Sequence, residues 1–408
     1  MTHVVVVGGG QAAVSVLAKL RSLGFDGRLT LLGDEDHLPY QRPALSKKYL
    51  LGELSAERLL LRPASFYQQQ GIAVLLGQPV TAIDTTAQCV LRAGEPVPYD
   101  RLVLATGSRP RRLPAEAGGL LDGVHAVRSR DDVDALATEL LPDRHLLVVG
   151  GGYVGLEAAA VAIQKGLRVT VVEFASRILA RVAAPETARL VRELHERRGV
   201  RFLEGRGVER LLGTEGRVHA ALLTDGTELG VDCVVAGIGI EPATALAASA
   251  GIRCDNGISV DAHGRTSAPQ VWAAGDCASF PWRGARIRLE SVQNAIDQAE
   301  AVALDILGRP QPYDPVPWFW SDQYDSKLQI AGLGAGHDCI VLREGPGKAR
   351  SVWYFQGSRL CAVDAIDDAR SYLVGRQMLQ AGLSPEPHAV RDPAFDLRSL
   401  LAAATRSP

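Results

Sequence analysis

The chain has 408 residues, of which 47% are hydrophobic, enough apolar material for more than one domain core. Its formal net charge of −2 gives no bulk basic character, so we expect no nucleic-acid partner. No apolar run approaches the roughly 20 residues that span a bilayer, and a strand pattern starts within the first few residues. We therefore expect neither a membrane anchor nor a signal peptide, and we expect a cytoplasmic protein.

The first predicted element is a strand–turn–helix unit whose turn is rich in glycine. Residues 4–7 predict a strand, residues 8–13 form a turn of the pattern G-x-G-x-x-A, and residues 14–23 predict a helix. Glycines allow the tight turn and let the backbone approach a pyrophosphate, which the N–H groups and the dipole of the helix N-terminus attract. The candidate dinucleotide contacts in this turn are Gly8, Gly10, Ala12 and Ala13.

An acidic pair follows the next predicted strand. The strand covers residues 29–32, and Asp34 and Glu35 come after it, about 20 residues past the turn. A carboxylate at this distance can accept a hydrogen bond from a ribose hydroxyl. Asp34 is the first choice for this contact and Glu35 the second, and the alternative is an ordinary solvated loop carboxylate.

The loop from residue 34 to residue 63 contains P-Y-Q-R-P-A-L-S-K at residues 39–47 and no cysteine. The cysteines of the chain do not form a CxxC or a CxxxxC pair, so we expect small buried hydrophobic side chains rather than dithiol chemistry, a disulfide framework or a metal cluster. They are Cys89, Cys233, Cys254, Cys277, Cys339 and Cys361.

A second strand–turn–helix unit carries a complete G-x-G-x-x-G at residues 150–155, between a strand at 146–149 and a helix at about 154–164. Two fingerprints imply two dinucleotides, and the usual reason to hold two is electron transfer between them. The following strand, residues 168–172, ends at Glu173, whose carboxylate can accept hydrogen bonds from a ribose and would repel a 2′-phosphate. NADH is therefore favoured over NADPH. Arg177 could weaken that preference, or it could contact a pyrophosphate or lie on the surface.

Three further apolar strands end on glycine, at residues 102–107, 233–239 and 271–276. Their order predicts a discontinuous first dinucleotide-binding domain with a second one inserted into it. Beyond residue 315 aromatic residues concentrate, and alternating segments such as residues 327–331 predict antiparallel strands. The expected domains are residues 1–108 with 233–314, residues 109–232, and residues 315–408.

Several of these motifs together resemble a known family. T-S-A-P-Q-V-W-A-A-G-D at residues 266–276, with L-A-T-G at 104–107, resembles the FAD-domain signature of flavoproteins with two dinucleotide-binding domains. R-P-A-L-S-K at 42–47, E-S-V-Q-N-A at 290–295 and W-F-W-S-D-Q-Y at 318–324 resemble the NADH-dependent ferredoxin reductases of oxygenase systems.

The resemblance implies an α/β fold, with two Rossmann-like domains of the glutathione reductase type and an α+β C-terminal domain. It implies the cofactors FAD and NADH, and a [2Fe–2S] ferredoxin as partner. That ferredoxin would serve a cytochrome P450 or a Rieske-type oxygenase. The reductase itself is expected to be a monomer or a weak homodimer.

The resemblance also assigns site residues. Lys47 would pair with Glu157 beside the nicotinamide and place positive charge near the flavin, Trp320 would lie near the flavin ring, and Asp276 would hold the ribityl chain. The alternatives are a surface lysine, an acid that complements the helix dipole and a core tryptophan. The FAD candidates are Gly8, Gly10, Ala12, Ala13, Asp34, Glu35, Arg42, Lys47, Val80, Ala105, Thr106, Gly107, Arg128, Asp276, Ser291, Val292 and Trp320. The NADH candidates are Gly150, Gly152, Tyr153, Val154, Gly155, Glu157, Glu173, Arg177 and Gly239.

Two other functions are compatible with this fold. An NADH oxidase or peroxidase would need a redox cysteine near Ser46, where the sequence has none. A signalling flavoprotein of the apoptosis-inducing-factor type shares the R-P-x-L-S-K stretch, but the expected lack of a targeting segment and of a basic surface disfavours it. Arg283, Arg286 and Arg288 could meet an acidic ferredoxin or belong to a solvated loop. Glu300 and Gln329 fall in regions where relatives use basic residues for docking.

Overall fold

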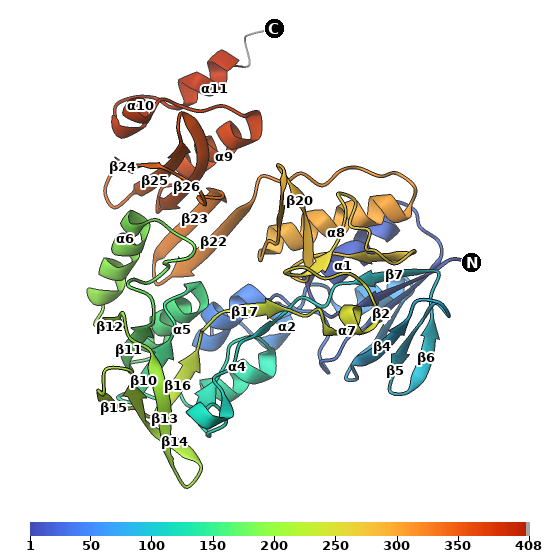
Figure 1. Cartoon of the computed structure of the whole chain (residues 1–408), viewed down its shortest axis with the longest axis horizontal. Coiled ribbons are helices and arrows are strands. Elements are labelled where there is room, and N and C mark those ends of the chain that lie inside the picture. Colours follow the sequence, from blue (N-terminus) through green and yellow to red (C-terminus); the bar gives the residue numbers. More distant parts are fainter. Residues whose placement is uncertain (405–408) are drawn as a thin grey trace. The chain divides into compact units, whose positions relative to one another are not determined.

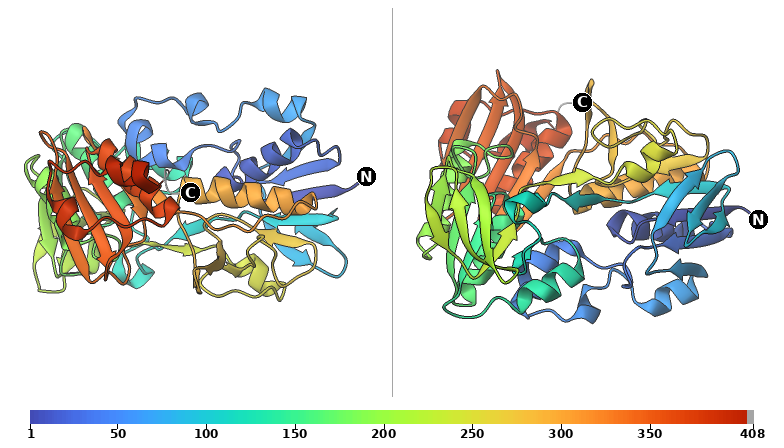
Figure 2. Two further views of the ribbon diagram at one scale, coloured as in Figure 1. Left: turned by 90° about the horizontal axis from the view of Figure 1, so that it is seen from above. Right: turned by 60° about the horizontal axis from the view of Figure 1, so that its bottom comes forward.

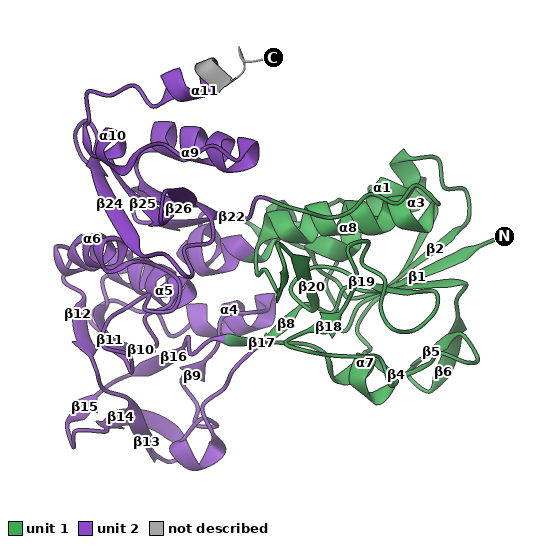
Figure 3. Cartoon of the chain, turned by 45° about the horizontal axis from the view of Figure 1, so that its top comes forward, with its two compact units in different colours: residues 1–42, 54–109, 240–315 green, residues 43–53, 110–239, 316–408 purple. Residues whose placement is uncertain are grey.

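The computed structural model describes residues 1–404, so the last four residues of the expected C-terminal domain lie outside the described part. The chain forms two compact units, which are coloured separately in Figure 3. Unit 1 comprises residues 1–42, 54–109 and 240–315, and unit 2 comprises residues 43–53, 110–239 and the chain from 316 onward. Each unit thus combines three separate segments of the sequence.

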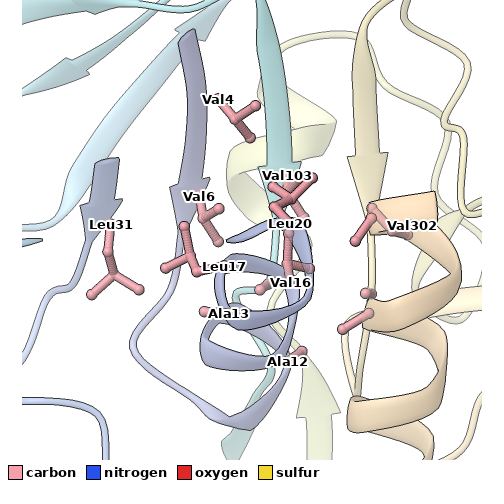
Figure 4. Packing of buried hydrophobic residues seen from close by; sticks show 14 of the residues in the cluster. Val4, Val6, Ala12, Ala13, Val16, Leu17, Leu20, Leu31, Val103 and Val302 are labelled. Atoms are coloured by element: carbon pink, nitrogen blue, oxygen red, sulfur yellow. The ribbon is translucent and has the colours of Figure 1, made fainter. Parts of the chain in front are cut away.

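Unit 1 is built on a five-stranded parallel sheet with the strand order β19-β7-β1-β2-β3. The strands are β1 (His3–Val7), β2 (Arg28–Leu32), β3 (Ile72–Leu75), β7 (Arg101–Leu104) and β19 (Val271–Ala273). All residues of β1 are buried, as expected for a parallel sheet covered on both faces. Helices α1 (Gln11–Ser22) and α8 (Val292–Ile306) pack together, and Figure 4 shows Leu17, Leu20 and Val302 in the core they share.

The rest of unit 1 consists of short elements around this sheet. One antiparallel sheet contains β4 (Val80–Asp84), β5 (Cys89–Arg92) and β6 (Glu95–Pro98). A mixed sheet contains β18 (Ile258–Ser259), β20 (Ala278–Trp282) and β21 (Ala285–Ile287), with β18 parallel and β21 antiparallel to β20. The short helices are α2 (Ala56–Leu59), α3 (Ala64–Gln69) and α7 (Ala245–Ser249). Where the chain passes between the units lie η1 (Arg42–Ala44), β8 (Ser108–Pro110) and β17 (Ile240–Pro242).

Unit 2 contains a second parallel sheet, with the strand order β12-β11-β10-β16-β9. The strands are β9 (Val124–His125), β10 (His145–Val149), β11 (Arg168–Glu173), β12 (Arg201–Glu204) and β16 (Cys233–Ala236). The helices are α4 (Arg130–Ala137), α5 (Tyr153–Gln164) and α6 (Pro185–Glu196), with the short turns η2 (Leu45–Tyr49) and η3 (Ala115–Ala117). A small antiparallel sheet adds β13 (Val208–Thr214), β14 (Arg217–Leu223) and β15 (Glu228–Gly230).

Residues 43–53 and 233–239 lie in unit 2, not with the first dinucleotide-binding unit where we expected them. Residues 233–239 were assigned to the first dinucleotide-binding domain, but β16 pairs with β10 in the sheet of unit 2. The chain returns to unit 1 only at residue 240. A short buried apolar strand that ends on glycine fits either parallel sheet equally well, and only its pairing partner decides between them.

The third part of the fold belongs to unit 2 and is an antiparallel sheet of the order β22-β23-β26-β25-β24. Its strands are β22 (Trp318–Gln323), β23 (Ser326–Gly332), β24 (Cys339–Glu344), β25 (Arg350–Gln356) and β26 (Arg359–Ile366). Helix α9 (Ala369–Ala381) packs on β26 (Figures 1 and 2), and α10 (Pro387–Arg391) and α11 (Arg398–Ala404) follow. Trp353 and Phe355 are fully buried in the core of this part.

One arginine makes several hydrogen bonds to the end of α10 and to the segment that follows it. The guanidinium of Arg343, on β24, donates hydrogen bonds to backbone carbonyls between residues 389 and 395. These carbonyls lie outside any sheet, so the arginine supplies donors that a neighbouring strand would otherwise provide.

The two parallel sheets begin in the same way. His3 opens β1 in unit 1 and His145 opens β10 in unit 2, and each ring bonds a threonine of the next strand, Thr30 at 2.8 Å and Thr170 at 2.9 Å. The backbone N–H of each histidine donates to an aspartate at 2.7 Å, to Asp100 and Asp232 respectively. The two units are therefore built on one repeated scaffold.

Among the described helices, none has the length and apolar character required to cross a membrane.

Candidate functional site

The glycine turn of unit 1 leaves room for a phosphate at the start of α1. Gly8 has φ +126°, and a Cβ there would lie 2.1 Å from the backbone oxygen of Ala105, so this position requires glycine. Gly10 is the N-cap residue, has no capping side chain, and would direct a Cβ into open space. A helix N-terminus with this clearance fits the pyrophosphate of a dinucleotide, in contact with Gly8, Gly10, Ala12 and Ala13.

The two acids after β2 have different surroundings. The carboxylate of Glu35 accepts hydrogen bonds from the Tyr40 hydroxyl and, at 2.5 Å, from the Arg42 guanidinium. Asp34 is exposed. Because Glu35 is hydrogen-bonded to neighbouring side chains, Asp34 is the better candidate to accept a hydrogen bond from a ribose hydroxyl. The guanidinium of Arg42 forms its ion pair with Glu35.

The ends of β7 and β19 bring the L-A-T-G and A-G-D motifs to the same edge of the sheet. Thr106 donates a 2.8 Å hydrogen bond to the backbone oxygen of Ala243. Asp276 accepts one of 3.0 Å from Ser108. A Cβ on Gly275 would lie 3.1 Å from the Cβ of Ala12, so glycine lets the end of β19 approach α1 closely. The candidates that this edge presents are Ala105, Thr106, Gly107 and Asp276.

Three other FAD candidates lie where elements begin. Val80 opens β4 and Val292 opens α8, and both are half-buried. Ser291 is the N-cap residue of α8, and its hydroxyl accepts a 3.2 Å hydrogen bond from the N–H of Asn294. The structure thus gives Ser291 a capping role in the fold.

The glycine turn of unit 2 is packed more tightly. Gly150 has φ +103°, and a Cβ there would lie 2.4 Å from the backbone oxygen of Gly237. A Cβ on Gly155 would lie 2.4 Å from the backbone oxygen of Gly150, so the third glycine is required as well. Gly152 faces open space, as Gly10 does in unit 1. This second helix N-terminus therefore also fits a dinucleotide phosphate.

At the end of β11, Glu173 and Arg177 organise the backbone around them. The carboxylate of Glu173 accepts 2.7 Å hydrogen bonds from the N–H groups of Gly151 and Ala175. Arg177 donates to carbonyls of the following loop, most closely to that of Ala183 at 2.8 Å. Arg177 thus stabilises the loop that follows it. Glu173 stabilises the glycine turn and places a negative charge next to that turn.

The other NADH candidates differ in exposure. Val154 is 44% exposed, and Gly239 has the left-handed φ of +100° that glycine permits. The ring of Tyr153 packs against Phe319 with centroids 4.9 Å apart, and its buried hydroxyl finds no hydrogen-bond partner among the described residues. Burial raises the pKa of Tyr153 well above its ordinary value.

The principal polar cluster of unit 2 surrounds Glu157, which is on α5 and 4% exposed. The Nζ atom of Lys47 lies 2.7 Å from Oε2, so the ion pair that the resemblance implies is present. Ser46 donates to the same oxygen at 2.5 Å, and Ser321 of β22 donates to Oε1 at 2.6 Å. Lys47 also donates to the backbone oxygen of Pro43 at 3.1 Å. We call Glu157, Lys47, Ser46 and Ser321 the Glu157 cluster.

Sequence reasoning missed the two serines of this cluster, although both belong to motifs that it had identified. Ser46 directly precedes Lys47, and Ser321 directly follows Trp320. The Trp320 ring lies 5.7 Å from that of Trp318 and 6.5 Å from that of Phe319, centroid to centroid. Trp320 therefore belongs to an aromatic group and is only half-buried.

The remaining polar candidates are largely engaged within their own unit. Arg128 directly precedes Ser129, the N-cap residue of α4. Arg286 donates to backbone carbonyls, and Arg288 pairs with Glu290 at 2.6 Å. Arg283 is exposed and lies over the ring of Trp282. Glu300 pairs with Lys19 at 2.7 Å. Of the expected positive run, Arg283 and Arg286 are both exposed, but the guanidinium of Arg286 is hydrogen-bonded to backbone carbonyls.

Two helix N-termini with clearance for a phosphate, one in each unit, fit two dinucleotides. Residues 2–299 match the pyridine nucleotide-disulphide oxidoreductase family, and residues 318–401 match the reductase C-terminal family. The chain belongs to the pyridine nucleotide-disulphide oxidoreductase family, which binds FAD and NAD(P)H.

Known relatives are similar over nearly the whole chain. A ferredoxin–NAD(P)+ reductase of a Sphingomonas species is 43% identical, with 98% of each chain covered. Putidaredoxin reductase of Pseudomonas putida is 40% identical, covering 98% of this chain and 97% of the relative. The reductase in the crystal structure of the covalent putidaredoxin reductase–putidaredoxin complex is 40% identical, with a TM-score of 0.95 and coverage of 100% and 99%. The predicted fold and the predicted class, a ferredoxin reductase enzyme, are confirmed.

Proposed function

We propose that this protein oxidises NADH and reduces a [2Fe–2S] ferredoxin, which in turn supplies a cytochrome P450 or a Rieske-type oxygenase. One NADH and two oxidised ferredoxins would give NAD+, one proton and two ferredoxins that each carry one more electron. The observation that carries the proposal is the Glu157 cluster, because a lysine–carboxylate pair with two serine hydroxyls stands where a thiol relay would require cysteine.

FAD would be held by unit 1, through the turn at Gly8 and Gly10, the carboxylate of Asp34, and the edge that carries Thr106 and Asp276. When bound, FAD accepts two electrons together from a nicotinamide and releases them one at a time. The residues present fit this cofactor because the clearance at Gly10 and the exposed Asp34 match its pyrophosphate and its ribose.

NADH rather than NADPH is the proposed donor. Glu173 places a carboxylate beside the turn of unit 2, where a 2′-phosphate would meet like charge. Arg177, the residue that could have favoured the phosphate, donates its hydrogen bonds to loop carbonyls instead. Both side chains therefore favour the unphosphorylated ribose.

Within the Glu157 cluster we assign Lys47 the role of supplying positive charge to the reduced flavin. Glu157 fixes the ammonium group of Lys47 at 2.7 Å, and a buried charge fixed in advance stabilises developing charge without reorganisation during the reaction. Trp320 would cover the flavin ring. Lys47, Glu157 and Trp320 are thus the candidate catalytic residues.

The proposal keeps a cytoplasmic location, where NADH is available as donor, and a monomer or a weak homodimer. Arg283 is the first candidate contact for an acidic ferredoxin, because Arg286, although also exposed, donates to backbone carbonyls and Arg288 pairs with Glu290.

The deciding experiment measures NADH oxidation by the FAD-loaded protein with ferricyanide, with oxygen alone, and with a panel of [2Fe–2S] ferredoxins coupled to cytochrome c. We expect fast reduction of cytochrome c that depends on ferredoxin, with slow oxygen consumption. Fast reduction of oxygen or peroxide without stimulation by ferredoxin would overturn the proposal and favour an oxidase. Slow turnover with a long-lived charge-transfer complex would instead favour a signalling flavoprotein.

A further inference from the structure

Behind the Glu157 cluster, hydrogen bonds continue away from the carboxylate. Ser321, which donates to Glu157, is fully buried on β22. Gln323 lies two residues further along the same strand, so both side chains point to the same face. The amide nitrogen of Gln323 donates to the Ser321 hydroxyl at 3.1 Å.

The next member of this series is His195 of α6, which is also fully buried. Its Nε2 lies 2.7 Å from the amide oxygen of Gln323, and its Nδ1 lies 3.1 Å from the hydroxyl of Tyr324. The series therefore links Glu157 of α5 to His195 of α6 through Ser321 and Gln323 of β22, and continues beyond His195 to Tyr324. All of these residues belong to unit 2.

The carboxylate of Glu157, at one end of the series, can only accept hydrogen bonds, and this determines which atom donates at each later step. Ser321 gives its only proton to Glu157 and must accept from the amide nitrogen of Gln323. The amide oxygen of Gln323 is then an acceptor, so His195 carries its proton on Nε2 and accepts at Nδ1 from Tyr324. Four donors in a row point toward one carboxylate, an arrangement in which each hydrogen bond polarises the next.

Charged groups around His195 are consistent with this neutral tautomer. Burial lowers the pKa of His195 to about 4, the hydrogen bond with Gln323 opposes that shift, and the positive charge of Arg198 adds to it. Arg198 also lies over the ring of Tyr324, and it pairs with Asp325, which Lys348 contacts as well. On the side of β12, the ring of Phe202 faces the imidazole, with Arg192 above that ring and paired with Glu204.

We propose that His195, Gln323 and Ser321 are positioning residues that hold Oε1 of Glu157, so that Oε2 stays directed at Lys47. The two carboxylate oxygens of Glu157 have different partners. Oε2 contacts Ser46 and Lys47, whereas Oε1 accepts a hydrogen bond from Ser321. The series orients the carboxylate without conducting protons, because an amide such as that of Gln323 cannot accept a proton on one side and release one on the other without leaving its stable form. The inference deepens the proposed function and rests on it for its kinetic consequence alone.

The first test reads the tautomer and does not depend on activity. Long-range ¹H–¹⁵N correlation spectra of ¹⁵N-histidine-labelled, FAD-loaded protein show which ring nitrogen carries the proton, and His195→Gln identifies the signal. We expect the Nε2–H tautomer at pH 7. A proton on Nδ1, or a positively charged ring at that pH, would overturn the donor order whatever electron acceptor the protein uses.

The second test compares His195→Phe with His195→Gln. Phenylalanine keeps an aromatic ring but leaves Gln323 without its donor, whereas the amide of glutamine can still donate to it. We expect NADH-dependent flavin reduction to slow about tenfold in His195→Phe with KM for NADH nearly unchanged, and to stay within about twofold of wild type in His195→Gln. His219→Gln, at an exposed site on β14, is the matched control and should behave as wild type.

These outcomes separate the explanations. Equal slowing in both His195 variants would assign the effect to packing and overturn the positioning role, as would an unaffected His195→Phe. If His195→Phe fails to fold, Gln323→Leu tests the same link from the other side and should give the same slowing. If NADH fails to reduce the flavin of the wild type, the proposed function fails, while the tautomer result still tests the donor series.

Discussion

The two nucleotide turns stand on the same scaffold but differ at one helix position. His3 and His145 open their sheets with equivalent threonine and aspartate partners. Counting from the first glycine of each turn, Ser15 of α1 occupies the place of Glu157 on α5. Ser15 accepts a 3.2 Å hydrogen bond from Gln11 of its own helix, whereas Glu157 binds side chains from two other segments. One copy therefore only holds a nucleotide, and the other also carries the cluster proposed for chemistry.

The largest expected effect separates the third small residues of the two turns. Gly155→Ala places a Cβ about 2.4 Å from the Gly150 carbonyl, where only backbone movement can relieve the contact. We expect kcat/KM for NADH to fall about a thousandfold, or roughly 4 kcal/mol. Ala13→Gly in unit 1 should cost only about 1 kcal/mol of unfolding free energy in urea titrations, through helix propensity. If Ala13→Gly lowered kcat/KM for NADH as strongly as Gly155→Ala, the result would contradict the tighter packing around Gly155.

The second prediction concerns pH and the buried histidine of unit 2. The pKa of His195 falls from 6.5 to about 4 on folding, so between these values the unfolded chain binds a proton that the folded chain does not. Stability from this group is therefore complete above pH 6.5, is lost as the pH falls, and levels off below pH 4. The total contribution of His195 to the free energy of unfolding that is lost over this pH range is about 3 kcal/mol. The difference in unfolding free energy between wild type and His195→Gln should change by that amount from pH 7 to pH 4, and a constant difference would contradict it.

A third prediction compares Glu157 with its counterpart in unit 1. Glu157→Gln removes the charge that holds Lys47 and turns an amide donor toward groups that are themselves donors. Stopped-flow reduction of the flavin by NADH should slow about 100-fold, a size typical of a lost preorganised charge contact. Ser15→Ala removes only a hydrogen bond within α1 and should change this rate less than about twofold. A comparable slowing in both variants would remove the distinction between the copies.

The smallest effect concerns the two ribose acids. Glu173→Ala should lower the preference for NADH over NADPH about tenfold in kcat/KM, because a repelling carboxylate is lost. Asp34→Ala should leave this ratio unchanged and weaken retention of FAD, measured by ultrafiltration of the yellow protein. A shift in nucleotide preference from Asp34→Ala would show that the two turns had been assigned to the wrong nucleotides.

Local sequence patterns predicted both glycine turns and the central strands of both parallel sheets, but not the edge strands β3, β9 and β12. Gly8 and Gly150 each stand between an apolar strand and a helix, so the neighbouring residues specify the structure. The same patterns could not place β16, because its pairing with β10 depends on a strand more than 80 residues earlier. Helix α6 and strands β13 to β15 also went unpredicted, although α6 is amphipathic and buries Thr187, Val191 and His195 on one face.

The Glu157 cluster shows the same limit at the level of side chains. Lys47 and Glu157 were paired through resemblance, not from their own surroundings in the sequence. Ser321 and Gln323 lie more than 160 residues from Glu157, and their common face becomes meaningful only once β22 is placed beside α5. His195 looks like an ordinary polar residue of an amphipathic helix until its burial is known.

Arg343 has a consequence for how this chain meets proteases. One guanidinium caps several carbonyls between residues 389 and 395. The same stretch is also held by the ion pair between Arg370 and Asp396 and by the buried side chains of Val390 and Leu397. Cleavage near residue 391 would remove fewer than 20 residues and leave β24 and the rest of its sheet intact. The susceptibility of this end to limited digestion therefore reports on how firmly Arg343, the Arg370–Asp396 pair and the buried Val390 and Leu397 hold it to the sheet.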